Sequence, residues 1–175
     1  MAFTRNLFFR SNGRHKDDNT IKIITERKMK KQDYTTSITV NATPQEVFEK
    51  ISSVTKWWTE DLKGSSQKLN DEFTVRFGDV HMSKQKLVDV VPDQKIVWLV
   101  TDSKLNFIED KSEWTGTKIS FDLSKVEDKT QINFTHVGLV PQVECYESCV
   151  QGWDQYVKGS LLKLLTEGQG TPASK

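Results

Sequence analysis

The sequence predicts a single α+β domain in which a long C-terminal helix packs across a curved antiparallel sheet of about six or seven strands. Residues 34–40 alternate polar and β-branched side chains with a period of two, which is typical of a strand with one wet face. Strand-like segments joined by short links fill residues 73–137, and an apolar stripe of helical spacing fills residues 143–167. A sheet with one apolar and one solvent-exposed face and an amphipathic helix bury their apolar faces against each other.

Composition narrows the function classes. The chain has 175 residues, which fits one domain better than two. Its 25 basic residues nearly balance 24 acidic ones, so the folded body offers no strong field for nucleic acid. No stretch approaches the roughly 20 apolar residues that a membrane-spanning helix needs. We therefore expect neither nucleic-acid binding nor membrane insertion.

The basic residues gather at the N-terminus. Residues 1–32 are rich in Arg and Lys and poor in apolar side chains, and Met29 opens a run that would itself make a normal protein start. The apolar run Leu7–Phe9 is too short for a secretory signal. We expect residues 1–32 to form a disordered basic extension and residues 33–172 to form the domain.

Two short helices are expected after the first strand. Thr43 is a good N-cap, Pro44 suits the first helical position, and Glu46 stands three residues after the cap, which together make a capping box. This helix would bury Val47, Phe48 and Ile51. A second short helix is expected over residues 54–58, and Gly64-Ser65-Ser66 is expected to break the chain.

The remaining strands follow in series. Strands are expected over residues 73–77, 80–91, 95–101, 117–124 and 131–137, with a short edge strand at Asn106–Asp110. Pro92-Asp93-Gln94 is expected to form a turn, and residues 127–129 are expected to close a hairpin. Alternation places His136 on the same inward face as Ile132 and Phe134.

The final helix is expected from about Val143 to Glu167, with Gly168 ending it. Its apolar stripe comprises Tyr146, Cys149, Val150, Trp153, Val157, Leu161, Leu164 and Leu165. Gly152 and Gly159 share one face, and each costs about 1 kcal/mol relative to alanine in a helix interior. Either the missing side chain leaves space for a ligand, or the helix approaches the sheet closely, which is the commoner cause.

The two cysteines, Cys145 and Cys149, do not make a disulfide framework. On a helix their spacing of four makes a strain-free bridge unfavourable, so we expect reduced thiols in a cytoplasmic protein. With His81 or His136 they would offer soft ligands to zinc, but a structural zinc site takes four ligands. We expect no metal and no cofactor.

The chain resembles the SRPBCC superfamily, also called START-like or birch-pollen-allergen-like, over about residues 33–172. Within it, the chain is similar to the branch named for the activator of the ninety-kilodalton heat-shock protein's ATPase. The matching residues are Val40–Phe48, the pair Trp57-Trp58, Gly152-Trp153, and Leu161, Leu164 and Gly168. The resemblance implies a helix-grip fold. Members of the superfamily bind lipids, hormones or polyketides, and a few catalyse cyclisation or hydrolysis.

We therefore predict a non-catalytic protein that binds a hydrophobic, lipid-like small molecule between the sheet and the final helix, as a monomer or homodimer. The expected ligand-binding residues are Trp57, Phe73, Phe77, Trp98, Phe121, Phe134, His136, Gly152, Trp153 and Tyr156. Trp57 and Trp58 are not expected to point inward together from one short helical turn, and core packing explains Trp98 better than ligand binding does.

Two alternatives stay open. An enzyme of the cyclase or hydrolase kind would use His136 as acid or base, or the histidine simply satisfies a backbone partner at the edge of the core. A chaperone-associated interaction module would instead need an exposed apolar patch.

Overall fold

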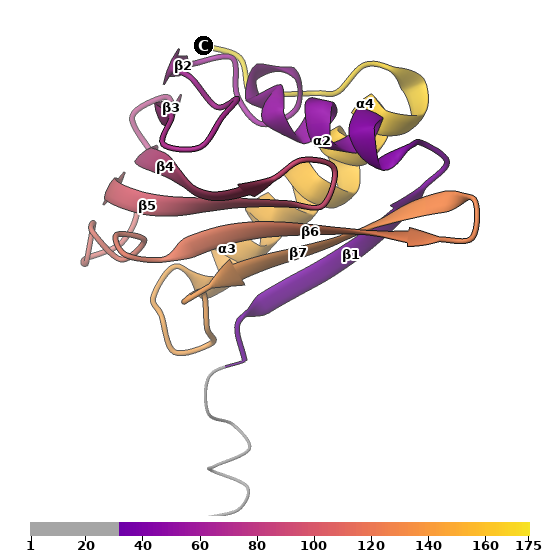
Figure 1. Cartoon of the computed structure of the whole chain (residues 1–175). Coiled ribbons are helices and arrows are strands. Elements are labelled where there is room, and N and C mark those ends of the chain that lie inside the picture. Colours follow the sequence, from indigo (N-terminus) through magenta and orange to yellow (C-terminus); the bar gives the residue numbers. More distant parts are fainter. Residues whose placement is uncertain (1–31) are drawn as a thin grey trace, which may run out of the picture. The chain divides into compact units, whose positions relative to one another are not determined.

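The computed structural model describes residues 32–175 (Figure 1). The elements are β1 (Tyr34–Val40), α2 (Pro44–Ser52), the 3₁₀ turn η1 (Val54–Lys56), β2 (Leu62–Gly64), β3 (Glu72–Phe77), β4 (His81–Val91), β5 (Lys95–Leu105), β6 (Lys118–Val126), β7 (Lys129–Val137), α3 (Tyr146–Trp153), η2 (Asp154–Leu161) and α4 (Leu162–Glu167). The expected basic extension lies outside the described residues except for Gln32. The boundary expected at residue 33 stays a prediction.

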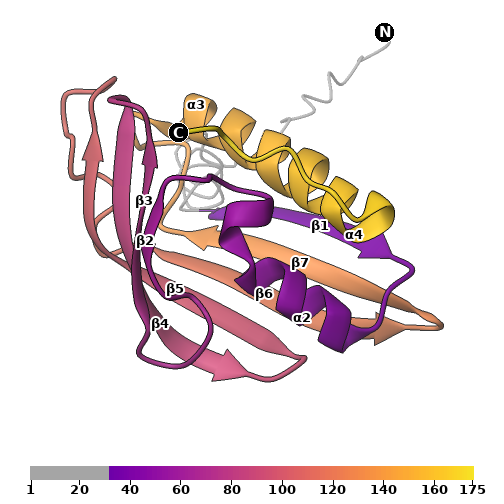
Figure 2. The same cartoon turned by 90° about the horizontal axis from the view of Figure 1, so that it is seen from above.

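The seven strands form one antiparallel sheet in the order β1-β7-β6-β5-β4-β3-β2. The helical segments α3, η2 and α4 follow one another without a break and cross behind the sheet in Figure 1. Figure 2 shows the sheet curving around this long helix, with α2 beside its C-terminal part. The predicted α+β helix-grip fold is confirmed.

Local chemistry explains where α2 begins and where the long helix ends. The Thr43 hydroxyl accepts the backbone N–H of Glu46 at 3.2 Å, and the Glu46 carboxylate accepts the backbone N–H of Thr43 at 2.8 Å. This is the predicted capping box, with Pro44 at the first helical position. Gly168 ends α4 in the left-handed conformation with φ +80°.

One expectation for the sheet was wrong, and one strand was not predicted. Asn106–Asp110 is a turn rather than an edge strand, because β5 runs on to Leu105 and the chain then loops before β6. Leu62–Gly64, which was not predicted as a strand, forms the edge strand β2, paired with β3, and ends at the break expected at Gly64-Ser65-Ser66. Gly64 allows this because its φ of +106° is a conformation that other residues rarely adopt.

The long helix begins at Tyr146 and is not α-helical throughout. Asp154–Leu161 has π-helical hydrogen bonding, which is wider than the α-helix. The buried residues Cys149, Trp153, Val157 and Leu161 are four apart. At 3.6 residues per turn, each step of four rotates about 40° too far, so the wider turn helps to keep these side chains on the sheet side.

All five tryptophans are buried in one stacked set. Trp57 stacks on Trp98 and on Trp58, Trp58 stacks on Trp153, and Trp153 stacks on Trp114, with interplanar angles between 11° and 27°. The expectation that Trp57 and Trp58 cannot both point inward was wrong, because both are at most 2% exposed. The backbone of Trp57, with φ −139°, is no longer helical. The consecutive side chains of Trp57 and Trp58 can therefore both reach the core.

Two glycines allow a controlled test of the edge strand. A Cβ on Gly64 would lie 2.2 Å from the Glu72 carbonyl oxygen, whereas a Cβ on Gly78, also at positive φ, would meet nothing within 4 Å. Gly78→Ala should cost about 1 kcal/mol for its left-handed backbone. Gly64→Ala should lower the free energy of unfolding, measured with urea, by at least twice as much. Equal losses would show that β2 does not hold Gly64 against Glu72.

Candidate functional site

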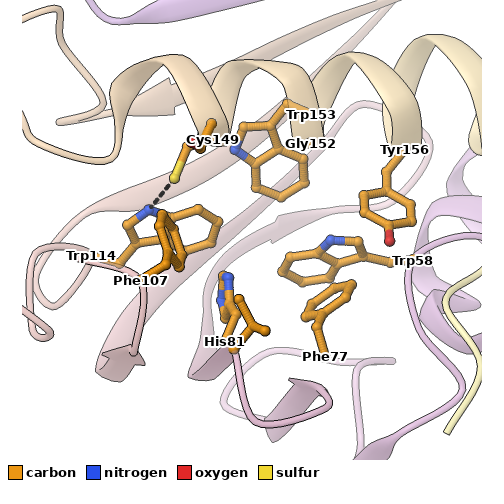
Figure 3. A pocket seen from close by; sticks show the side chains of 11 residues that line it. Trp58, Phe77, His81, Phe107, Trp114, Cys149, Gly152, Trp153 and Tyr156 are labelled. Atoms are coloured by element: carbon orange, nitrogen blue, oxygen red, sulfur yellow. Dashed lines mark hydrogen bonds between the residues drawn. The ribbon is translucent and has the colours of Figure 1, made fainter.

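One cavity of about 400 Å³ lies between the long helix, the β3–β4 turn and the loop from β5 to β6. This volume falls in the range of small-molecule sites. Figure 3 shows side chains from these elements converging on the open space. The lining residues are Trp58, Phe77, Val80, His81, Phe107, Trp114, Ser148, Cys149, Gly152, Trp153 and Tyr156.

Gly152 gives the helix wall of the cavity its open space. A Cβ placed there would meet nothing within 4 Å. Of the two explanations for the helix glycines, the structure favours vacant space over close packing at this position. Gly159 differs, because it is exposed and its Cβ would meet only the Asp154 carbonyl of the same helix, at 4.0 Å.

The mouth of the cavity is apolar. Val80 is 55% exposed and Phe107 is 43% exposed, and both line the cavity. The turn that carries Val80 and the loop that carries Phe107 are joined, because the backbone N–H of Asn106 donates to the Val80 carbonyl at 2.8 Å. An apolar ligand would therefore meet apolar side chains on entering.

Among residues 32–175, no Asp, Glu, Lys or Arg side chain lines the cavity. Burial lowers the pKa of His81 to about 4, so its imidazole is neutral at pH 7. Burial likewise raises the pKa of Tyr156, so its hydroxyl keeps its proton. The cavity therefore presents an uncharged interior.

The loop residue Trp114 is anchored to the start of the long helix. Its Nε1 lies 3.3 Å from the sulfur atoms of both Cys145 and Cys149. The neighbouring Glu113 carboxylate accepts the backbone N–H of Cys145 at 2.8 Å. The hydrogen bond of the Cys145 thiol with Cys149, and then burial, raise the pKa of Cys145, so this sulfur is a protonated thiol. Both cysteines are free, as expected.

His136 lies in the core behind this site and is fully buried. Its Nδ1 accepts the indole N–H of Trp153 at 2.9 Å, and its Nε2 lies 2.9 Å from Thr117 Oγ1. The Thr117 hydroxyl donates onward to the Trp114 carbonyl at 2.6 Å. Burial, and then the neighbouring His81, lower the pKa of His136 to about 3. Its partners are side chains rather than the backbone, and they occupy both ring nitrogens.

The structure separates the expected site residues into two groups. Phe77, Gly152, Trp153 and Tyr156 line the cavity. The other expected residues lie in the core and do not line it: Trp57, Phe73, Trp98, Phe121, Phe134 and His136. Sequence reasoning did not include Trp58, Val80, His81, Phe107, Trp114, Ser148 and Cys149. Of these, only Cys149, in the apolar stripe, carried a periodic signal.

Within the described residues, no group of three or more His, Cys, Asp or Glu side chains could hold a metal ion. Across residues 32–175, helices long and apolar enough to cross a membrane are absent.

The family model "Activator of Hsp90 ATPase homolog 1-like protein" matches residues 18–166. No curated protein matches the chain. The match begins inside the segment that we expected to precede the domain.

Solved structures share the fold. The Aha1 dimer from Colwellia psychrerythraea is 24% identical, with a TM-score of 0.65, over 80% of this chain and 100% of that one. SSP2350 from Staphylococcus saprophyticus is 18% identical, with a TM-score of 0.61, over 82% and 98%. DynU16, from the dynemicin biosynthetic locus, is 16% identical, with a TM-score of 0.60, over 83% of this chain and 52% of that one.

The neutral histidines predict acid sensitivity. Folding lowers the pKa of His81 and His136 from 6.5, so the unfolded chain takes up their protons first as the pH falls. Their stabilisation should be complete above about pH 6.5 and should decline toward about pH 4, by up to about 1.4 kcal/mol per pH unit for each histidine.

Urea unfolding at a series of pH values between about 7 and about 5 measures this slope. His136→Gln keeps a hydrogen-bond acceptor for Trp153 but does not titrate, so its stability should depend less steeply on pH. A slope equal to that of the wild type would contradict the assignment to His136.

Proposed function

The chain belongs to the family of Activator of Hsp90 ATPase homolog 1-like proteins, and from this premise we propose that it binds a neutral, hydrophobic small molecule without transforming it. The proposed site is the cavity beside Gly152. The proposal also places the protein in the cytoplasm, where its two thiols stay reduced.

The observation that carries the proposal is a preformed apolar space walled by aromatic rings. Trp58 and Trp114 are each already stacked on Trp153, so a ligand would not have to order these three rings. Preorganised walls reduce the entropy cost of binding. The described residues that line the cavity carry no charged side chain, which favours a neutral ligand, because a buried charge needs a partner.

The catalytic alternative finds less support. A general acid or base must reach the ligand and titrate near the working pH. His136 has both ring nitrogens occupied by Trp153 and Thr117, and burial keeps His81 neutral. No carboxylate from the described part of the chain lines the cavity. These features support binding rather than turnover.

A chaperone contact is the second candidate, and the family description motivates it. The exposed side chains of Val80 and Phe107 would offer such a partner an apolar contact surface at the mouth of the cavity. The Aha1 relative is described as a dimer, so we retain a homodimer beside the monomer as a proposal for this chain.

A matched pair of glycine variants tests the ligand site. Gly152→Leu would project a side chain into the cavity, whereas Gly159→Leu would project one into solvent. Both substitutions raise helix propensity, so both variants should fold. Intrinsic tryptophan fluorescence reports binding, because three tryptophans line the cavity.

Titration with fatty acids, sterols, flavonoids and aromatic polyketides should give a saturable change in tryptophan fluorescence with one of these classes of compound. Gly152→Leu should weaken this binding at least tenfold, and Gly159→Leu should bind like the wild type. A flat response of the folded wild type to the whole panel would contradict the proposal and favour the chaperone contact. Equal binding by Gly152→Leu would place the site elsewhere.

A further inference from the structure

Three polar side chains follow one another along the inward face of β4. His81, Ser83 and Gln85 are two residues apart, so a strand places them on the same side. Ser83 and Gln85 are fully buried. Ser83 Oγ lies 3.0 Å from His81 Nε2 and 2.6 Å from the end of the Gln85 amide. The three side chains therefore form one hydrogen-bonded row that ends at the cavity.

The surroundings of Gln85 fix the orientation of its amide. The backbone carbonyls of Phe73 and Ser83 lie 3.2 Å and 3.1 Å from one end of the amide, and carbonyls can only accept. That end is therefore the NH₂ group. The amide oxygen consequently faces Ser83 Oγ at 2.6 Å, and the hydrogen between them belongs to the serine hydroxyl.

The direction of this bond determines the tautomer of His81. The Ser83 hydroxyl has one hydrogen and gives it to Gln85, so toward His81 its oxygen can only accept. His81 therefore carries its proton on Nε2, and because the ring is neutral, Nδ1 is left as a lone-pair acceptor. Within residues 32–175, Nδ1 of His81 has no hydrogen-bond partner, and its ring lines the cavity (Figure 3).

His136 provides an internal comparison. Trp153 can only donate, so Nδ1 of His136 accepts and its proton also lies on Nε2, directed at Thr117. The two histidines thus share a tautomer. The protein itself supplies a donor to Nδ1 of His136 and none, within the described residues, to Nδ1 of His81.

We propose that Nδ1 of His81 is the acceptor that selects the ligand, so that the cavity prefers a neutral aromatic molecule with a hydroxyl or N–H donor. The ring faces and edges of Trp58, Trp114 and Trp153 favour a planar aromatic body. This inference rests on the proposed function, because it names the chemical class that the same cavity would take.

A pair of probes isolates the hydrogen bond. The naphthalene alcohol 2-naphthol and its methyl ether, 2-methoxynaphthalene, share a ring system, but only the alcohol donates. The ratio of their affinities is compared between the wild type and His81→Phe, which keeps a planar ring against Trp114. The comparison between proteins cancels the difference in hydration of the probes. The preference for the alcohol should fall about tenfold in the variant.

Ser83→Ala tests the cause of the preference. The variant keeps the His81 ring but removes the acceptor that holds the proton on Nε2. The preference for the alcohol should therefore also decrease, although the cavity lining is unchanged. Long-range ¹H–¹⁵N NMR correlations of the ligand-free wild type should show the His81 proton on Nε2. A proton on Nδ1 would overturn the inference.

The remaining outcomes separate the two proposals. Suppose that both probes bind the wild type and that Gly152→Leu excludes them. If the wild type then shows no preference for the alcohol, or if the preference survives in His81→Phe, the ligand site stands and the role of His81 is overturned. A surviving preference would point to the Tyr156 hydroxyl, which also lines the cavity. If neither probe binds the folded wild type, the proposed function fails for small aromatics, and this inference fails with it.

Discussion

The hydrogen bond from the Trp153 indole to His136 is the contact on which the arrangement of helix and sheet depends. It spans 2.9 Å between a donor on the long helix and an acceptor on β7, and both side chains are almost fully buried. An indole can only donate, so the bond requires a neutral His136. The same indole stacks on Trp58 and Trp114, which come from two separate turns. One residue therefore sets the position of the helix and of two cavity walls.

A space of this size in a close-packed interior needs a structural cause. Gly152 removes a side chain immediately before Trp153, where the helix faces the cavity. The π-helical turn that follows carries Tyr156 to the same wall. Opposite them, Trp114 is held by two thiols, and Glu113 secures its loop to the start of the helix. The helix wall and the loop that carries Trp114 are thus held in place by specific contacts, so the cavity is not simply a packing defect.

The sequence allowed the regular part of the fold to be predicted, because capping residues and alternation act locally. The capping box at Thr43 and the inward face of His136 depend only on near neighbours. β2 was missed because three residues show no period, and Trp57 and Trp58 were misjudged because their backbone leaves the helix.

The candidate site was predicted only where it uses regular elements. Alternation places Phe121 and Phe77 on inward faces alike, but it does not say which end of the sheet stays open, so core and cavity residues could not be separated. Phe107 and Trp114 come from an irregular loop without any period. His81, Ser83 and Gln85 lie in an expected strand, but the mixed alternation of residues 80–91 did not show which face points inward, so the hydrogen-bonded row was not predicted. The row also determines which chemistry His81 can perform. With a pKa of about 4, His81 is too weak a base for efficient proton abstraction, but its neutral ring still accepts a hydrogen bond. Ligand recognition requires only this acceptor.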